Sequence, residues 1–316
     1  RVLHNRLDWN VRGYSHGFYR RGQDSAGILC YEQSSNNVFA YNSATHSGDG
    51  FFLWAGQTTL DTGEGGCNDN LIYGNDFSHA PTNGVEITFS RNRVVANRLE
   101  ECNYGVWGGY SRETVIEAND IRDNEYGVAI EHGQENAIVH NLFYKNETAL
   151  RLWERESQLA GWGYSENRDV RSRDYIIGGN AFVENGTALR ISHTDKVAIN
   201  DDNQFHDLDT LLWAHAPNPR NVLANNDACQ SAGFEGAETV GELNRIHPPL
   251  PPEERPGAPW LMDRRGGTDP PPVLPDGLDA FLPETHPRGR KYILVDEWGP
   301  YDFRYPSVWL RDVTRE

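Results

Sequence analysis

A four-residue phrase recurs along this chain at nearly constant spacing, and this repeat limits the possible folds more than any other feature. Gly or another small residue opens the phrase, and apolar residues follow at alternate positions. The phrase begins at Gly27, Gly50, Gly84, Gly105, Gly127, Ala149, Ala188 and Thr210. The steps are 23, 34, 21, 22, 22, 39 and 22 residues, so a period of about 22 is interrupted by two insertions of roughly 12 and 17 residues. A period of this size indicates a solenoid.

A second phrase, Asn followed two residues later by an apolar residue, keeps the same period. Its asparagines are Asn42, Asn75, Asn97, Asn119, Asn141, Asn180 and Asn203. An apolar residue also lies three positions before most of them, so each repeat offers three short strands separated by turn residues. Asn tolerates left-handed turns and bonds nearby backbone, so stacked Asn residues are expected to form a ladder.

Short strands of this kind are stable only in a stack. Runs of four or five residues do not form a sheet alone. When coils stack at ~4.8 Å, each strand pairs with its copies above and below, and the inward residues share one core. The sequence therefore predicts an all-β, right-handed parallel β-helix with coils of about 22 residues and two loop insertions. Its inward residues are expected to include Ile28, Phe51, Val85, Val106, Val128, Leu150 and Leu189.

Proline usage divides the chain. Of its 17 prolines, 16 lie from Pro217 onward. We therefore expect the β-helix in residues 1–215, with almost no α-helix, and a Pro-rich extended segment or linker in 216–290. Residues 291–316 form a strand-like aromatic tail, which either caps the solenoid or begins a further domain. Trp260 is the expected anchor if the Pro-rich segment lies against the coils.

Charge and hydropathy exclude two classes of partner. The formal net charge is −17, whereas nucleic acids and anionic membrane surfaces attract basic proteins. No stretch approaches the ~20 apolar residues that a membrane span needs. We expect neither a nucleic-acid partner nor a membrane span.

The Asn-x-apolar and Gly-apolar-x-apolar coils resemble the carbohydrate-binding and sugar-hydrolase β-helix repeats of the pectate-lyase-like superfamily, over roughly residues 10 to 215. That superfamily includes lyases, hydrolases, epimerases, binding proteins and a maturation factor for a copper enzyme. The resemblance implies a polysaccharide or oligosaccharide partner and an extracellular or cell-surface location, the periplasm included.

Alternation along each Gly phrase sends two positions per coil outward. The first outward column reads Leu29, Phe52, Glu86, Trp107, Ala129, Arg151, Arg190 and Leu212. The second reads Tyr31, Trp54, Thr88, Gly109, Glu131, Trp153 and Ser192. Aromatic residues mixed with Glu and Arg are typical of a sugar-binding cleft, so the predicted substrate-binding residues are Trp54, Trp107, Arg151, Trp153 and Arg190. The alternative is that the tryptophans pack beneath the insertions or the Pro-rich tail.

Both insertions leave the end of a Gly strand, and long insertions in compact repeats are usually functional or disordered. They comprise Ala55 to Cys67 and Glu154 to Arg173. They are expected on one edge, bordering a groove floored by Glu86, Trp107 and Glu131. Glu86 and Glu131 are the predicted acid and base of an inverting hydrolase or of a lyase.

Two arginines complicate this outer face. Arg151 is expected either to pair with Glu131 or to hold a substrate carboxylate. Arg151 and Arg190 are neighbouring like charges, which need a carboxylate or a bound anion to offset them.

Metal-ligating residues are sparse, and we predict no cofactor and no metal. His46, Asp49 and Asp24 are the one candidate set for a divalent cation, but two carboxylates and one imidazole are incomplete, and turn-capping aspartates explain them better.

The four cysteines show no CxxC spacing. Cys30 falls on an inward position and is expected to be a buried thiol. Cys67 and Cys102 are placed to bridge a loop to the neighbouring coil.

Three functions remain open from the sequence. The first is an enzyme acting on an extracellular polysaccharide. The second is a non-catalytic carbohydrate-binding or surface protein that uses the same aromatic residues. The third is a structural solenoid that self-assembles through its loops and tail.

Overall fold

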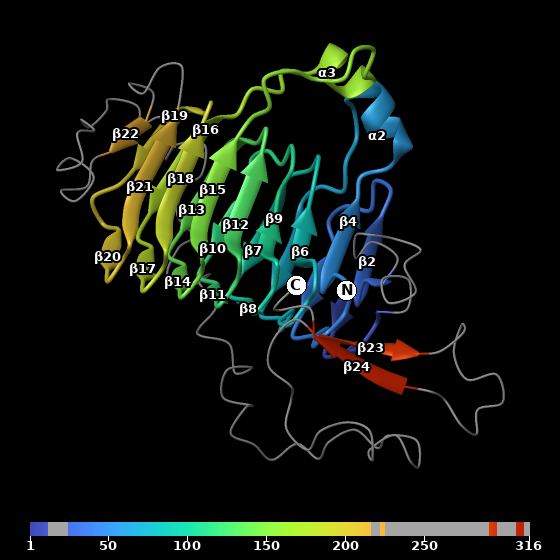
Figure 1. Cartoon of the computed structure of the whole chain (residues 1–316). Helices are drawn as coiled ribbons and strands as arrows, with labels where there is room; N and C mark the ends of the chain where they lie inside the picture. Colours follow the sequence, from blue (N-terminus) through green and yellow to red (C-terminus); the bar gives the residue numbers. More distant parts are fainter. Residues whose placement is uncertain (12–24, 216–221, 225–290, 296–307, 313–316) are drawn as a thin grey trace.

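The computed structural model describes residues 1–11, 25–215, 222–224, 291–295 and 308–312. Three all-parallel sheets make up the faces of a right-handed parallel β-helix, as predicted (Figure 1). Each coil contributes at most one strand to each sheet, so the sheets contain nine, five and eight strands. Strands pair with their counterparts one coil away rather than with sequence neighbours. This arrangement satisfies the backbone of strands too short to form a sheet alone.

We name the sheets A, B and C. Sheet A contains β1 (Val2–Leu3), β3 (Val38–Ala40), β5 (Asn70–Tyr73), β7 (Asn92–Val95), β10 (Val115–Glu117), β13 (Gln134–Val139), β16 (Arg173–Gly178), β19 (Asp195–Ile199) and β22 (Val222–Ala224). Sheet B contains β8 (Arg98–Glu100), β11 (Asp120–Arg122), β14 (Leu142–Tyr144), β17 (Ala181–Val183) and β20 (Gln204–His206). Sheet C contains β2 (Ile28–Tyr31), β4 (Phe51–Trp54), β6 (Asn83–Ile87), β9 (Tyr104–Trp107), β12 (Tyr126–Glu131), β15 (Thr148–Trp153), β18 (Thr187–Ser192) and β21 (Thr210–His215).

Parallel strand pairing therefore extends beyond residues 10 to 215, the span that the repeats indicated. At one end β1 pairs with β3, and at the other β22 pairs with β19. In the tail, β23 (Lys291–Val295) pairs antiparallel with β24 (Val308–Asp312). Most of the Pro-rich segment, Trp260 included, lies outside the described residues.

The core lies between the three sheets, and the predicted inward residues occupy it. All seven are buried, with relative exposures of 6% or less. The register corrects the last coil, because Arg190 pairs with Trp213 and Leu189 with Leu212. Trp213, not Leu212, therefore ends the first outward column. The phrase was aligned one residue early there, since Thr210 is the counterpart of Thr187.

The predicted Asn ladder forms the corner between sheets A and B. The backbone N–H and side-chain Nδ2 of Asn97 donate to Oδ1 of Asn119, at 2.9 and 3.1 Å. Asn119 Nδ2 donates in turn to Asn141 Oδ1 and to the Val94 carbonyl, both at 2.9 Å. Each buried amide thus satisfies backbone groups that the turn leaves unpaired.

Two further ladders were not predicted. Between sheets B and C the ladder is formed by Asn124, Asn146 and Asn185. Between sheets C and A it is formed by Asn37, Asn70, Asn92, Thr114 and Asn136. All three corners thus use buried side chains to bond the coil beneath.

Left-handed turn residues recur beside the ladders. Among the described residues, 25 positions other than Gly have a positive φ. Ala96, Ala118 and His140 form one such column, with φ of 53°, 55° and 57°. Each donates its N–H to the next coil, as Ala96 does to Glu117 O at 2.9 Å. The inter-coil bond offsets the cost of a conformation that residues with a Cβ rarely adopt.

The only helices in the described β-helix lie in the two insertions. The first insertion carries α2 (Gln57–Thr62) and the second carries α3 (Gly163–Asn167). The two helices meet beyond the ends of the sheet C strands (Figure 1). Arg168 Nη1 donates to the Gly63 carbonyl at 2.9 Å, which ties the second insertion to the first.

Candidate functional site: the outer face of sheet C and the adjoining corner

Consecutive strands of sheet C align the predicted outward side chains. Glu86 pairs with Trp107, and Trp107 pairs with Ala129. Ala129 pairs with Arg151, which pairs with Arg190. Because a parallel register places the side chains of paired residues on one face, the predicted residues form a column along the solenoid.

Aromatic rings cover the middle of this column. Trp107 and Trp153 are half-buried, with ring centroids 5.6 Å apart. Tyr104 lies 5.3 Å from Trp107 and stacks on Tyr126 at 5.0 Å. We refer to these four rings with Arg151 as the sheet C strip. The tyrosines were not predicted, although their 22-residue spacing at the start of each strand carried the signal.

The two neighbouring arginines are offset by aromatic rings. The Arg151 guanidinium lies 4.2 Å from the Trp153 ring and 5.3 Å from that of Tyr126. Arg190 lies 4.9 Å from the ring of Trp213. These cation–π contacts replace the carboxylate or anion that the sequence led us to expect.

Glu131 pairs with a different arginine from the one considered in the sequence. Its Oε1 accepts hydrogen bonds from Arg155 Nε at 2.7 Å and from Trp153 Nε1 at 2.9 Å. The Arg155 side chain is 66% exposed, whereas that of Glu131 is only 6% exposed. Arg155 was missed because it belongs to the second insertion and has no counterpart in other coils.

Glu86 has its own partner. It is buried in β6, and its Oε2 accepts from Asn83 Nδ2 at 2.9 Å. Trp107 separates it along the column from the coil of Glu131. The structure thus gives each carboxylate separate hydrogen-bond donors, and their acid–base role stays a prediction.

The insertions cover the corner after sheet C, instead of standing apart on either side of its face. Phe89, Tyr110 and His132 form a stacked column at this corner, with successive ring centroids 4.9 and 4.8 Å apart. Trp162 and Tyr164 of the second insertion pack edge-on against Tyr110, at 5.2 and 5.6 Å. Trp54, also half-buried, lies at the base of the first insertion.

His132 is held as a neutral imidazole by its partners. Nδ1 lies 2.7 Å from the Val170 carbonyl, which can only accept, so Nδ1 carries the proton. Nε2 accepts from the backbone N–H of Arg155 at 3.0 Å and from Gln158 Nε2 at 2.7 Å. Burial lowers the pKa of His132 further from physiological pH.

A small pocket opens beside this histidine. Its lining includes Tyr110, Arg112, His132, Tyr164 and Asp169. Burial raises the pKa of Tyr110 to about 12. Arg171 hydrogen-bonds Asp169 and holds the pKa of that carboxyl well below its usual range. The pocket is therefore lined by groups that keep their protonation state near neutral pH.

Metal-ligating side chains are dispersed. No cluster of three or more His, Cys, Asp or Glu able to hold a metal ion occurs within the described ranges. His46 is stacked between Trp9 and His79, at 4.1 and 4.5 Å. Asp49 Oδ1 accepts from the Asn83 N–H at 2.9 Å, which is the turn-capping role considered above. Asp24, the third candidate, lies outside the described residues.

The cysteines in the described ranges are free, and Cys67 is not bridged to Cys102. Cys30 is buried as predicted, and its Sγ lies 3.5 Å from the Ser34 carbonyl. Cys102 Sγ instead lies 3.5 Å from the Glu100 carbonyl and 3.6 Å from that of Phe77. Hydrogen bonding from the Cys30 thiol lowers the pKa of Cys67, and the same contact raises that of Cys30.

The chain was compared with known proteins. No curated protein matches it. None of the helices in the described part is long and apolar enough to cross a membrane. A protein-family model described as "NosD: Periplasmic copper-binding protein" matches residues 21–204. This covers more than half of the 316 residues and includes most of the coils. The match supports the β-helix part of the resemblance and a periplasmic or extracellular location. The chain therefore belongs to the NosD family.

Proposed function

We propose that this protein binds an acidic polysaccharide along the outer face of sheet C and does not cleave it. The observation that carries the proposal is the sheet C strip. Its rings come from consecutive coils and remain partly exposed. Its spacing follows the ~4.8 Å of a parallel sheet, so an extended chain can contact several coils at once.

The chemistry of the strip favours a sugar acid. Pyranose rings present C–H faces that stack on Trp and Tyr. Arg151 and Arg190 provide guanidinium groups able to bind a carboxylate through two parallel hydrogen bonds. Arg155 also lies beside Trp153 with its side chain mostly exposed, but Glu131 offsets its charge. A local cluster of arginines on a chain of net charge −17 selects an anionic ligand at this face.

The hydrogen bonds of the two carboxylates favour binding over cleavage. Glu131 already accepts two hydrogen bonds, one from a charged donor. A hydrogen bond from a charged donor stabilises the carboxylate and makes it a weaker base. Glu86 is buried and bonded to Asn83. The polar and aromatic groups of this face are therefore best suited to binding, and hydrolysis or lyase activity is the alternative.

Copper, the ligand in the family's description, requires other donors. Copper binds sulfur or imidazole, and the sheet C strip consists of Trp, Tyr and Arg. The described residues with sulfur donors of this kind are Cys30, Cys67 and Cys102, and all three are buried. Glycan binding on this face does not involve them.

The test is binding of wild-type protein to a panel of uronate-containing and neutral oligosaccharides. Trp107→Ala should weaken binding to the acidic ligands by roughly tenfold or more, which corresponds to about 1.4 kcal/mol. Arg151→Gln should weaken acidic ligands and leave neutral ones unchanged. Leu29→Ala is the matched control, because Leu29 lies in the same column but is an exposed aliphatic residue at the N-terminal end.

Release of reducing ends measures the alternative. We expect none from any ligand that binds. Cleavage that disappears in Glu86→Gln and Glu131→Gln would establish the enzyme instead. Equal affinity of wild type, Trp107→Ala and Arg151→Gln for every ligand would remove the proposed face.

A further inference from the structure

A second apolar cluster lies on the outer side of sheet A, apart from the core. Ile176 is next to Ile177, which belongs to the core, so strand alternation directs Ile176 outward. Ala137 and Ala198 form the rest of this buried cluster, and Val115 packs against it. The parallel register pairs each of these residues with the next one along the solenoid. The cluster therefore crosses four consecutive strands, on a different face from the sheet C strip.

The side chains of this outer cluster are as buried as those of the core. Ile176 is 2% exposed and Ala198 is 0% exposed. The nearest neighbours of Ile176 on the same face are small. Ala137 and Ala198 flank it on the adjacent strands, and Gly178 lies two positions further along β16. Two methyl groups and a hydrogen atom do not cover an isoleucine side chain, so the burial indicates a further layer over this face.

Two polar atoms of this face are buried and have no hydrogen-bond partner within the described ranges. They are Nε of Arg93 and Oδ1 of Asn200. Arg93 pairs with Val115 in the register. The Asn200 amide lies against Gly178, with Nδ2 2.7 Å from the position that a Cβ would take there. Buried polar groups nearly always have partners, so the covering layer is expected to supply an acceptor for Arg93 and a donor for Asn200.

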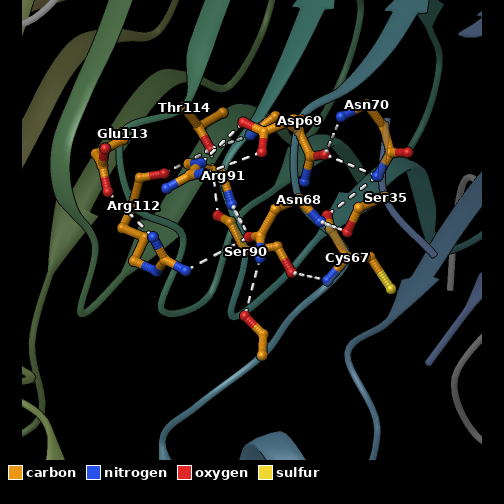
Figure 2. A network of polar contacts seen from close by, with 12 residues as sticks. Ser35, Cys67, Asn68, Asp69, Asn70, Ser90, Arg91, Arg112, Glu113 and Thr114 are labelled. Atoms are coloured by element: carbon orange, nitrogen blue, oxygen red, sulfur yellow. Dashed lines mark hydrogen bonds and ion pairs between the residues drawn. The ribbon is translucent and has the colours of Figure 1, made fainter. Parts of the chain in front are cut away.

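The charged rim of this face is paired within itself. At the corner where the strands of sheet A begin, Arg91 donates to both carboxylate oxygens of Asp69, at 2.8 and 3.0 Å (Figure 2). Figure 2 also shows Arg112, which donates to Glu113 at 3.0 Å. Because these charges already have partners, the rim does not require a highly charged ligand. The apolar cluster and the two unpartnered atoms therefore determine what fits the face.

We propose that residues 248–262 of this chain bind along the outer face of sheet A as an extended polyproline-type segment. The chain leaves the β-helix from this sheet, because β22 pairs with β19. The residues that follow, 225–290, contain 12 of the 17 prolines. Within them, the proposed segment begins with two proline pairs and ends in a Trp-Leu-Met run that includes Trp260, the anchor expected from the sequence.

The length of this segment matches the face. A polyproline II chain rises ~3.1 Å per residue, so its 15 residues extend ~46 Å. The nine strands of sheet A span ~38 Å at a spacing of ~4.8 Å. One extended segment is therefore long enough to cover the whole face.

A polyproline-type chain also suits the groups that it would cover. It has no internal hydrogen bonds, so a carbonyl is free to accept from Arg93 Nε and a non-proline N–H is free to donate to Asn200 Oδ1. Proline rings and the Trp260 ring supply apolar surface for the Ile176 cluster. The preformed helix loses little entropy on binding. Because the segment is tethered to the sheet that it covers, its effective concentration exceeds that of a separate partner.

The chain contains a single methionine, Met262, which gives a specific probe of the segment. Oxidation by peroxide depends on exposure, and mass spectrometry follows it at this one position. In the full-length protein Met262 should oxidise roughly tenfold more slowly than in a synthetic peptide of residues 248–266, which corresponds to about 1.4 kcal/mol in favour of the bound segment. Equal rates in the protein and the peptide would overturn the proposal.

A substitution on the face tests where the segment binds. Ala137→Arg places a charged side chain beneath it and should raise the rate of Met262 oxidation to that of the peptide. The coil tolerates this change, because Arg93 occupies the same column two strands away. Ala181→Arg is the matched control, since Ala181 is next to the core residue Phe182 and therefore faces outward on sheet B. Slow oxidation in a folded Ala137→Arg variant would contradict the assignment.

A second copy of the chain is the alternative occupant of this face. Light scattering at micromolar concentration should show a monomer, and a wild-type dimer that Ala137→Arg dissociates would overturn the proposal. Trp260→Ala changes the segment without touching the coils, and it should also speed the oxidation of Met262. An unchanged rate in that variant would remove Trp260 as the anchor and contradict the proposed segment. Glycan binding enters none of these readouts, so the two proposals are tested separately.

Discussion

Two corners of the β-helix hold the turns of successive coils together in different ways. Between sheets A and B, one residue type repeats: each coil places a buried Asn on the Asn of the next. Between sheets C and A, the turns differ in length, two insertions emerge, and aromatic rings from the insertions pack on a column of Phe89, Tyr110 and His132. The first corner is a stack of equivalent units. The second has a ladder interrupted by Thr114 and adds contacts made only once, so it is where a common fold acquires individual properties.

The largest expected effect comes from breaking the repeated corner. Asn119→Leu preserves the size of the side chain but leaves the buried N–H of Asn97 and the carbonyl of Val94 without their partners. Each unsatisfied buried group costs about 1–3 kcal/mol, so unfolding free energy should fall by roughly 3–5 kcal/mol. Denaturant unfolding followed by circular dichroism measures this loss.

Asn5→Leu is the control for that change. Asn5 lies at the N-terminal end of the same ladder and is exposed. It donates to Asn42 at 3.0 Å, and its own backbone lies at the edge of the stack. The expected loss is about 1 kcal/mol or less. Equal losses for Asn5→Leu and Asn119→Leu would contradict the cooperative ladder.

At the insertion corner, a core-like substitution should act locally. Tyr164 is 3% exposed and lies 4.9 Å from Phe89 and 5.6 Å from Tyr110. Tyr164→Ala removes both contacts, at a cost of about 2–3 kcal/mol confined to the insertion. Limited proteolysis should cut within residues 154–172 sooner, while the thermal midpoint of the coils stays unchanged. A lowered midpoint for the whole β-helix would mean that the two corners are one cooperative unit.

The contact between the insertions should have a smaller effect. Arg168→Ala removes the hydrogen bond to the Gly63 carbonyl and the cation–π contact with Tyr164. We expect about 1–2 kcal/mol of local destabilisation, seen as faster amide exchange in both α2 and α3. Arg171→Ala is the control, because Arg171 pairs with Asp169 on the surface of the same insertion. Faster exchange in α3 alone would show that α2 is stable without its neighbour.

The smallest expected effect is a pH dependence at His132. Because its pKa is lowered in the folded protein, the unfolded chain binds the proton more tightly. The stabilisation is complete above the unfolded pKa of about 6.5 and is lost as pH falls through the folded pKa. Local stability of the second insertion should therefore decline between pH 7.5 and 5.5, with a midpoint shift of about 1–3 °C. His132→Gln should remove this dependence, and an unchanged pH profile in that variant would assign it to another group.

The sequence predicted the features that recur from coil to coil. The coils, the A–B ladder, the inward residues and the outward column all recur at one period, so a single chain contains several copies of the same signal. The ladders at the other corners were missed because Cys102 and Thr114 interrupt the run of Asn. The last coil was misaligned because Thr210 occupies the position before the small residue, not the position of the small residue.

Contacts that occur once could not be predicted in this way. Arg155 pairs with Glu131, and Gln158 bonds His132, yet both belong to an insertion without counterparts elsewhere. Cys67 Sγ lies 3.4 Å from the Trp54 carbonyl only because the first insertion returns to the coil that it left. Periodicity says nothing about where an insertion folds back. Such partners become visible only when the backbone is known.

The A–B ladder also gives the solenoid an electrical polarity. Every amide in it points the same way, because each Asn Nδ2 donates to the Oδ1 of the following coil, from Asn5 to Asn203. Aligned dipoles add, as peptide dipoles do in a helix, and hydrogen-bonded amides polarise one another. The N-terminal end of the row is therefore negative and the C-terminal end positive. Carboxylates complement the positive end, because Asp201, Asp202, Asp207 and Asp209 lie close to the last Asn in the sequence.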